Sequence, residues 1–334
     1  MDVRKLSAAE LLERLNAPAA ASQLLDLSGL VLLVSGDGAL AGGDLAALAR
    51  EVAMLPAVIV GLHEPAAPVP PHLAPVCDVV LPEGDAALDA VLTTVGHNPL
   101  SAMSLALLLR TGDGRSVADG LLAESSVYST LQAGPEFAEW RRGRARRDRR
   151  QESGPTLTTN RDGGRFDIVL RRPAARNALS AQMRDELLEA LAVPVIDQSV
   201  EEVHLRGEGP SFCSGGDLDE FGTFPDQATA HLIRVAASVG RVISTLADRV
   251  VVHLHGACIG SGIELPAFAQ RVFARPDTSI ALPEVGFGLV PGAGGTVSLP
   301  RRIGRHRTAQ LALTAQPIGV ATALEWGLVD AIES

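Results

Sequence analysis

Short apolar runs alternate with longer amphipathic segments along the whole chain. Runs with the length of buried strands lie at 31–36, 57–62, 77–82, 165–172, 201–207, 250–256 and 271–276. Strands that alternate with helices are typical of βαβ units, in which a helix connects two parallel strands. The pattern therefore predicts an α/β fold with mostly parallel sheets.

Helical periodicity fills most of the intervals between these runs. The predicted helices cover 42–55, 99–110, 116–143, 180–192 and 228–247. Ser180 is predicted to cap its helix, because a serine oxygen there can accept a hydrogen bond from the first turn. Residues 1–17 also show helical periodicity and carry acidic side chains, unlike the apolar core of a signal peptide.

A polar stretch rich in arginine and glycine divides the chain near 145–163. The two halves share a pattern: GLVLLVSGDGALAGGDLAAL at 29–48 matches EVHLRGEGPSFCSGGDLDEF at 202–221 with a two-residue gap. In both, an apolar run is followed by Gly-x-Gly and then by GGDL. We predict that the halves arose by duplication, the alternative being a chance match in a glycine-rich chain.

The charge of the chain narrows the classes of partner. A formal net charge of −10 argues against general nucleic-acid binding, because a polyanion attracts a basic face. The basic run at 141–150 holds seven arginines. We interpret it as a solvated helix end that runs into a linker, with an RNA-binding arm as the alternative. No stretch approaches about 18 uninterrupted apolar residues, so no membrane helix is expected.

The cysteines and histidines suggest neither a disulfide nor a metal site. Cys77, Cys213 and Cys258 lack metal-ligand spacing and a paired framework, which favours a reducing, cytoplasmic location. Cys213 and Cys258 flank glycine-rich motifs and are interpreted as buried packing residues, with a thiol nucleophile as the alternative. His253 and His255 alternate on a predicted strand without a third ligand nearby, so no metal is expected.

Two glutamates carry the strongest chemical signal. Glu264 in IGSGIELP and Glu284 in ALPEVGFGLVPGAGGT each stand beside a glycine-rich stretch. Two carboxylates that face one reacting centre can move protons on and off carbon and water, and bare backbone N–H groups can hold the negative charge that this creates. The alternative is a helix-start acid at Glu264 and a salt-bridge partner at Glu284.

Five motifs in the second half, from about Phe166 to Ile332, resemble the crotonase (enoyl-CoA hydratase/isomerase) superfamily in the family's order. They are RRPAARNALS, SFCSGGDLDEF, HGACIGSGIELP, ALPEVGFGLVPGAGGTVSLPRRIG and ALEWGLVDAI. The resemblance implies the ββα superhelix of the ClpP/crotonase fold, with mostly parallel sheets and a helical region for trimerisation and cover. It also implies an acyl-CoA thioester as substrate, no further cofactor or metal, and a homo-oligomer, trimer or hexamer.

The motif positions imply roles for individual residues. Glu264 and Glu284 match the catalytic glutamates of hydratases, and the N–H groups of Gly216 and Ser261 match the oxyanion hole. At 261 the family usually has glycine; serine keeps the N–H but adds a hydroxyl. The residues implied to bind substrate or CoA are Ala175, Asn177, Gly215, Asp217 and Gly292.

The implied reaction is hydration of a 2-enoyl-CoA, as in fatty acid metabolism. The alternatives are another acyl-CoA reaction of the family, such as isomerisation, hydrolysis or decarboxylation in specialised metabolism, and a non-catalytic CoA-binding subunit. An intact glutamate pair favours hydration.

The segment 97–144 resembles the helical tail that follows the GLVD segment in the family. We therefore predict an abridged crotonase-like unit at 1–145 that carries this tail, a linker at 146–163 and a catalytic core at 164–334. The tail is expected to cover the core of its own chain or of a neighbour, an arrangement that amounts to a circular permutation.

Overall fold

The computed structural model describes residues 1–16, 30–35, 42–144 and 154–333 of the chain. Within these residues the strands form three sheets. The first sheet is parallel throughout and has the order β1-β2-β3-β4. Its strands are β1 (Asp2–Ser7), β2 (Leu30–Ser35), β3 (Val58–His63) and β4 (Val79–Pro82).

The second half of the chain builds the other two sheets. The six-stranded sheet has the order β13-β10-β8-β7-β6-β5, parallel except for the β5–β6 hairpin. Its strands are β5 (Leu157–Asp162), β6 (Arg165–Leu170), β7 (Glu202–Gly207), β8 (Val250–Leu254), β10 (Arg271–Ala274) and β13 (Ala331–Ile332). The three-stranded sheet contains β9 (Ala257–Ile259), β11 (Ser279–Ala281) and β12 (Ile318–Gly319). The predicted α/β class with mostly parallel sheets is confirmed.

Helices pack around and between the sheets. In the first half they are α1 (Ala8–Leu15), α3 (Gly42–Ala53), α4 (Leu73–Val76), α5 (Ala87–His97), α6 (Pro99–Arg110), α7 (Val117–Gln132) and α8 (Pro135–Arg142). In the second half they are η1 (Pro173–Ala175), α9 (Ala181–Ile196), α10 (Gln227–Ala236), α11 (Val239–Thr245), α12 (Ser261–Glu264), η2 (Pro266–Phe268), η3 (Glu284–Phe287), α13 (Gly295–Thr314) and α14 (Val320–Trp326).

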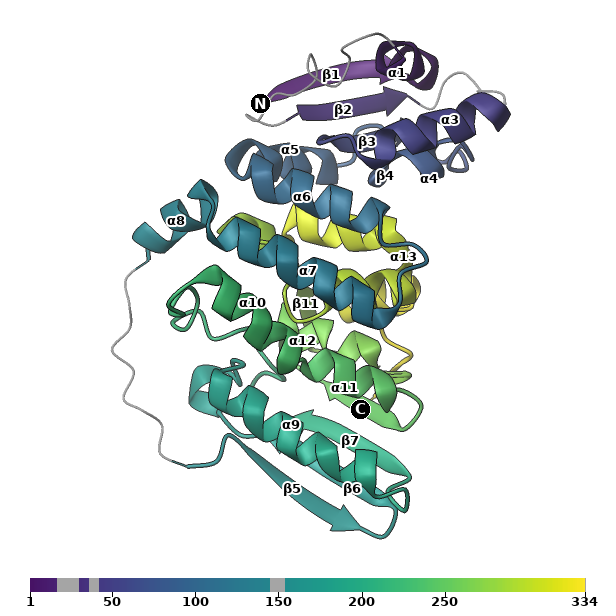
Figure 1. Cartoon of the computed structure of the whole chain (residues 1–334). Helices are drawn as coiled ribbons and strands as arrows, with labels where there is room; N and C mark the ends of the chain where they lie inside the picture. The colour runs from purple at the N-terminus through teal and green to yellow at the C-terminus, as the bar shows by residue number, and fades with distance from the viewer. Residues whose placement is uncertain (17–29, 36–41, 145–153, 334) are drawn as a thin grey trace.

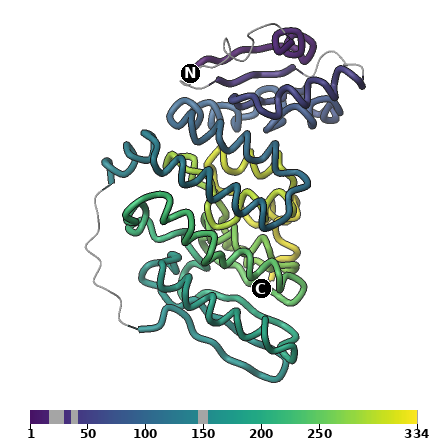
Figure 2. The backbone as a smooth tube through the Cα atoms, in the orientation of Figure 1, coloured from purple at the N-terminus to yellow at the C-terminus, as the bar shows by residue number. Residues whose placement is uncertain are grey.

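The elements are stacked along one long axis (Figure 1). The first sheet lies at one end and the β5–β7 part of the six-stranded sheet at the other, with layers of helices between them. Helices α5 to α7 come from the first half of the chain but lie against α13 and α10 of the second half. The backbone trace in Figure 2 shows the same crossing of early and late segments.

The central strands of the first sheet, β2 and β3, are buried on both faces because their residues are mostly apolar. Val31, Val58 and Val60 face the core that is shared with the rest of the molecule. Their neighbours Leu32 and Ile59 face a separate cluster formed with α1, α3 and α4. Successive side chains of a strand point to opposite faces, so a continuous apolar run fits this position.

Two arginines from other elements fasten this sheet to the molecule. Arg110 at the end of α6 binds both carboxylate oxygens of Asp78 at 2.7 and 2.6 Å, and both side chains are buried. The same guanidinium donates to the carbonyls of Val52 and Leu55. Arg305 on α13 donates to the carbonyl of Cys77. Polar contacts as well as apolar packing therefore join the first sheet and its flanking segments to α6 and α13.

The described structure differs from the predicted elements in several places, and the helical segment predicted over 116–143 is two helices, α7 and α8. Asp2–Ser7 is a strand that pairs with β2, not the start of a helix; the helix begins only after Ser7, whose side chain caps it. The single helix predicted over 228–247 is two, because Ser238 caps the N-terminus of α11. In the predicted linker 146–163, residues 157–162 form edge strand β5.

Other local predictions are confirmed or fall outside the described residues. Ser180 accepts a hydrogen bond from the N–H of Met183 (3.2 Å) at the start of α9. Helix α8 ends at Arg142, inside the arginine-rich run, and the run beyond residue 144 lies outside the described residues. The same is true of 29 and 36–41 in the first copy of the repeated pattern.

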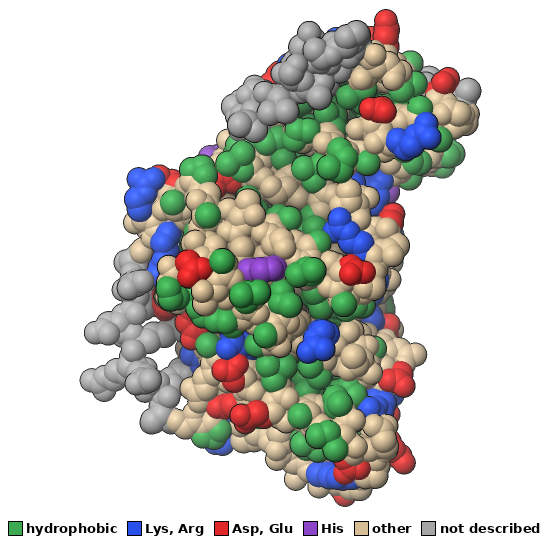
Figure 3. Space-filling view, viewed as in Figure 1, with side chains coloured by type: hydrophobic (Ala, Val, Ile, Leu, Met, Phe, Trp, Pro, Cys, Tyr) green, Lys and Arg blue, Asp and Glu red, His purple; other side chains and the backbone are tan. Residues whose placement is uncertain are grey.

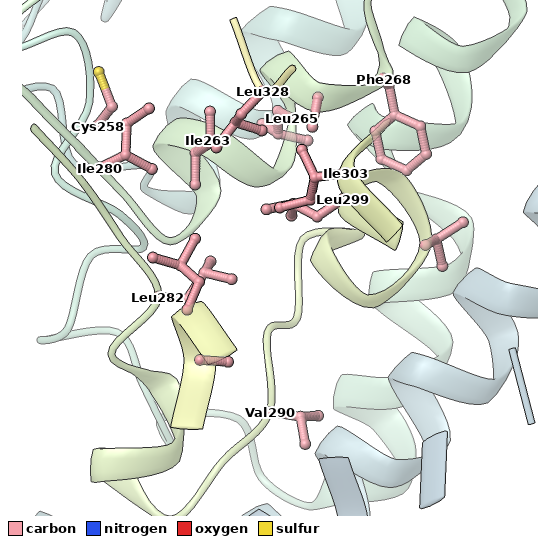
Figure 4. Packing of buried hydrophobic residues seen from close by; sticks show 14 of the residues in the cluster. Cys258, Ile263, Leu265, Phe268, Ile280, Leu282, Val290, Leu299, Ile303 and Leu328 are labelled. Atoms are coloured by element: carbon pink, nitrogen blue, oxygen red, sulfur yellow. The ribbon is translucent and has the colours of Figure 1, made fainter. Parts of the chain in front are cut away.

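The central core lies where α12, η2 and α13 meet the three-stranded sheet. Figure 4 shows Ile263 and Leu265 beside Leu299 and Ile303, with Phe268 at the edge of the cluster. On the face shown in Figure 3, acidic and basic side chains are interspersed among hydrophobic ones. Among the residues that the structure describes, that face offers no continuous basic surface to a polyanion.

Candidate active site

The four residues predicted to carry the chemistry line one cavity. Glu264, Glu284, Gly216 and Ser261 contribute to the wall of a cavity of about 420 Å³. They come from three places in the second half: the loop after β7, the short helix α12, and η3 after β11. The fold thus brings together residues that are up to 68 positions apart in the sequence, from Gly216 to Glu284.

The N–H of Gly216 points away from Leu179, the residue with which Gly216 forms a β-bridge. Leu179 donates to the carbonyl of Gly215 (2.8 Å), and Asp217 donates to the carbonyl of Leu179 (2.9 Å). In such a parallel bridge successive N–H groups point to opposite sides. The N–H of Gly216 therefore points away from Leu179, and within the described residues it has no acceptor.

The N–H of Ser261 is the second candidate donor. Ser261 is the first residue of α12, so its N–H has no carbonyl partner within the helix. The buried hydroxyl of Ser261 lies 3.8 Å from the Sγ of Cys213. Burial raises the pKa of the Cys213 thiol, which favours a packing role over that of a nucleophile.

Backbone N–H groups donate hydrogen bonds to the carboxylate of Glu264 and favour its ionised form. Its Oε2 accepts hydrogen bonds from the N–H groups of Ala293 (2.8 Å) and Gly295 (2.9 Å), just before and at the start of α13. Burial raises the pKa of Glu264 to about 7, against the lowering effect of these backbone donors. The side chain can therefore exchange a proton near neutral pH.

Glu284 has a different environment in the same cavity. Its Oε2 is buried and has no hydrogen-bond partner among the described residues, and its Oε1 lies against Gly260. A Cβ at position 260 would collide with Oε1, and Gly260 also has φ +51°, so glycine is required there. Burial, followed by the charge of Glu264, raises the pKa of Glu284 well above its ordinary value.

A third buried glutamate, Glu124, reaches the site from α7 in the first half. It accepts hydrogen bonds from the N–H groups of Gly294 (2.7 Å) and Thr296 (2.9 Å), and from the Thr296 hydroxyl (2.7 Å). The four successive N–H groups of 293–296 thus alternate between Glu264 and Glu124. Burial and then the charge of Glu264 raise the pKa of Glu124 to about 8.

Sequence reasoning did not single out Glu124. It lies 140 positions before Glu264, on a helix without an adjacent glycine-rich motif. The signal that pointed toward it was the resemblance of 97–144 to the family's tail, which contains a glutamate on a helix. Only the packing of α7 on α13 shows what that glutamate contacts.

Other residues of α7 close the cavity over the glutamates. Tyr128 and Gln132 line the cavity, and a Cβ at Gly292 would lie 2.5 Å from ring carbons of Tyr128. Gly120 packs equally closely against Val297, where an added Cβ would lie 2.9 Å from a methyl group. Helices of 97–144 therefore cover the second half within the same chain.

The five residues implied to bind substrate or CoA do not share one environment. Gly292 and Asp217 line the cavity, whereas Ala175 is half-buried at the end of η1 and does not line it. Asn177 is fully buried and its side chain bonds to backbone groups of neighbouring loops, so it shapes the loop. Gly215 has φ +98° and precedes the donor Gly216.

The described residues show neither a metal cluster nor a membrane helix. Among them, no group of three or more His, Cys, Asp or Glu side chains could hold a metal ion. No helix in this part of the chain is both long and apolar enough to cross a bilayer.

The profile of the enoyl-CoA hydratase/isomerase family matches residues 161–334, more than half of the chain. The chain belongs to this family, within the crotonase superfamily. The matched residues include Glu264, Glu284, Gly216 and Ser261, and the first half adds an α/β sheet of its own.

Individual members of the family are distant relatives of this chain. The enoyl-CoA isomerase/hydratase fer4 of Mycosarcoma maydis is 32% identical over 176 residues, 50% of this chain and 64% of the relative. An isomerase of trans-2-decenoyl acyl-carrier protein from Streptococcus mutans is 31% identical over 174 residues, 51% of this chain and 66% of the relative. The chain thus spans less than two thirds of the length of either relative.

Solved structures of the family share the fold. The crystal structure of enoyl-CoA hydratase from Mycobacterium smegmatis is 31% identical with a TM-score of 0.51, covering 54% of this chain and 71% of that one. Relatives named as hydratases and relatives named as isomerases match this chain at similar identity. Sequence similarity therefore identifies the family, and the reaction has to be inferred from the residues of the site.

Proposed function

We propose that this member of the family is an enoyl-CoA hydratase, a hydro-lyase that adds water across the C2–C3 double bond of a 2-enoyl-CoA. The observation that carries the proposal is the different environment of two glutamates in one cavity. Glu264 receives two backbone hydrogen bonds that favour its anion, while Glu284 has a buried oxygen without a donor. One carboxylate is suited to accept a proton and the other to give one.

The two backbone donors hold the thioester carbonyl. When the N–H groups of Gly216 and Ser261 bond the carbonyl oxygen, they stabilise the enolate that forms as C3 is attacked. A donor of this kind lowers the barrier by about 3–4 kcal/mol. Neither N–H has another acceptor among the described residues, so both are available to the substrate.

The proton inventory of the step then balances on the two glutamates. Glu264 takes a proton from water as the water oxygen bonds to C3, and the π electrons move onto the thioester as an enolate. Glu284, protonated because burial raises its pKa, delivers its proton to C2 as the enolate collapses. The water proton remains on Glu264 and passes to Glu284 or to solvent to reset the site.

The cover supplied by 97–144 supports the proposed division of the chain. Helices α6 to α8 lie over the site within one chain, the place that the predicted tail would take. We propose that 1–145 is an abridged unit that carries this tail and that 164–334 is the catalytic core. Trimeric assembly in the cytoplasm belongs to the same proposal, and light scattering on the purified protein tests the oligomeric state.

Hydration of crotonyl-CoA, followed by the loss of enoyl-thioester absorbance, tests the reaction. We expect turnover by the natural chain and a loss of about 10²–10⁴-fold in kcat/KM for Glu264→Gln and for Glu284→Gln. Glu189→Gln, on the exposed face of α9, is the matched control and should keep full activity. Turnover of a 3-enoyl-CoA without any hydration of 2-enoyl-CoA would contradict the proposal in favour of isomerisation.

A further inference from the structure

Arg234 on α10 places a cation in the wall of the candidate active-site cavity. It lines the 420 Å³ cavity that holds Glu264 and Glu284, and also a neighbouring cavity of about 480 Å³ that shares Gly292 and Ala293 with the first. The guanidinium therefore lies where the two cavities meet. The acyl chain of a substrate that enters at the thioester site and extends into the neighbouring cavity would pass Arg234.

The guanidinium is fixed in place by neutral groups. Its carbon lies 4.5 Å from the centre of the Tyr128 ring. Its nitrogens donate to the hydroxyls of Ser125 and Ser129 and to the amide oxygen of Gln132, all on α7. These contacts hold the planar group against one wall and leave part of its donor set for a ligand.

Among the residues that the structure describes, the hydrogen bonds of Arg234 go to hydroxyl and amide oxygens, and none goes to a carboxylate. The other arginine of the cavity, Arg184, pairs with Asp185 at 2.7 Å. The acid whose charge acts on Arg234 is Glu124, and its two carboxylate oxygens accept hydrogen bonds from the N–H groups of Gly294 and Thr296. Burial lowers the pKa of Arg234, and the charges of Tyr128 and Glu124 offset this shift only in part.

A half-buried cation without a counter-ion costs free energy unless a ligand supplies the opposite charge. A carboxylate matches the guanidinium fork in shape and charge. We propose that the acyl group of the substrate carries a carboxylate at the end remote from the thioester, and that Arg234 binds it. The inference rests on the proposed function only in taking the cavity as the acyl site.

Binding of saturated thioesters, which cannot be hydrated, tests the proposal apart from catalysis. Calorimetry would compare glutaryl-, adipoyl- and suberyl-CoA with pentanoyl-, hexanoyl- and octanoyl-CoA, which match them in carbon number. We expect at least one thioester whose acyl group ends in a carboxylate to bind about tenfold more tightly than the thioester of equal carbon number whose acyl group is uncharged. A natural chain that binds every neutral ester as tightly as its dicarboxylic partner overturns the proposal without recourse to any variant.

Variants locate the preference on Arg234. Arg234→Gln should abolish the preference and leave binding of the neutral esters within about twofold, and Arg234→Lys should keep part of it. Arg275→Gln is the control, because Arg275 is exposed and lines neither cavity. If Arg234→Gln weakens the binding of free CoA as much as the binding of adipoyl-CoA, the guanidinium binds a phosphate of CoA and the proposal fails. Absence of crotonyl-CoA hydration would sink the proposed reaction alone and leave this binding result standing.

Discussion

The tetrapeptide Gly-Gly-Asp-Leu occurs at 42–45 and at 215–218, and it forms a different structure at each place. In the first unit it starts helix α3 on the surface, and a Cβ at Gly43 would meet nothing within 4 Å. In the second unit it forms a loop beside the cavity. There Gly215 has φ +98°, and a Cβ at Gly216 would lie 2.7 Å from the Phe221 ring.

The neighbours cause this difference, because both copies follow a parallel strand. The second copy continues along another layer: Cys213 forms a parallel bridge with Cys258, and Gly215 lies against the carbonyl of Ile259. This layer carries Ser261 and Glu264 a few residues later. The first copy has no counterpart of that glutamate pair in its sequence. The second copy therefore becomes part of the candidate site because the neighbouring segment at 258–264 places Ser261 and Glu264 beside it.

The largest predicted effect concerns the attachment of the first sheet to α6. Arg110→Met should lower the free energy of unfolding by about 3–5 kcal/mol, because Asp78 is left buried without its partner. Urea denaturation measures the loss, with Arg50→Met on the exposed side of α3 as the control. A loss below about 1 kcal/mol would mean that apolar packing alone joins the first sheet to α6.

The next prediction tests the second copy of the tetrapeptide. Gly215→Ala places a side chain at φ +98° and 3.2 Å from the carbonyl of Ile259, so the loop must move and the N–H of Gly216 with it. We expect kcat for crotonyl-CoA to fall about 10²–10³-fold, the effect of losing one oxyanion donor. Unchanged kcat would show that Gly216 is not such a donor.

The pH dependence of the rate tests the contribution of α7 to the site. Glu264 must be ionised and Glu284 protonated, so kcat/KM should rise as pH passes through about 7, where Glu264 loses its proton, and fall at higher pH as Glu284 loses its own. Because the charge of Glu264 contributes to raising the pKa of Glu284, Glu264 titrates first.

Glu124→Gln should lower kcat/KM about tenfold and move the rising limb to higher pH. Glutamine cannot accept from both Gly294 and Thr296, so the 293–296 backbone loosens and the anion of Glu264 loses part of its hydrogen bonding. Burial raises the pKa of Glu264 and the charge of Glu124 does not contribute to that shift, so loss of this charge has little opposing effect. A rising limb that stays in place would remove Glu124 from the proton chemistry. Glu136→Gln, which tests a cap of α6 by another tail glutamate, is the control.

The smallest effect is expected at the first copy. Gly43→Ala should raise the free energy of unfolding by at most about 1 kcal/mol, since alanine is the better helix former and the added Cβ meets no neighbour. Activity should stay unchanged. Thermal denaturation and the hydration assay together measure both, and a loss of activity would mean that the two copies are closer in role than their structures indicate.

The sequence by itself determined many of the strands and helices, and it pointed to the family of the second half. Apolar runs buried on both faces gave the parallel strands, and five motifs in order pointed to Glu264, Glu284, Gly216 and Ser261, which line one cavity in the structure. Pattern reasoning failed where a strand depends on a partner, as at Asp2–Ser7, or where one serine ends a long periodic segment, as at Ser238.

Only the tertiary structure decided which residues surround the glutamate pair. Glu124 and Tyr128 from α7, and Arg234 from α10, reach the site through helix packing that no local pattern encodes. The same is true of the proton affinities, because burial and mutual charge raise the pKa values of the three glutamates. Burial and distance are properties of the folded chain. Residue types and their spacing are already present in the sequence, and they fixed only which groups could meet.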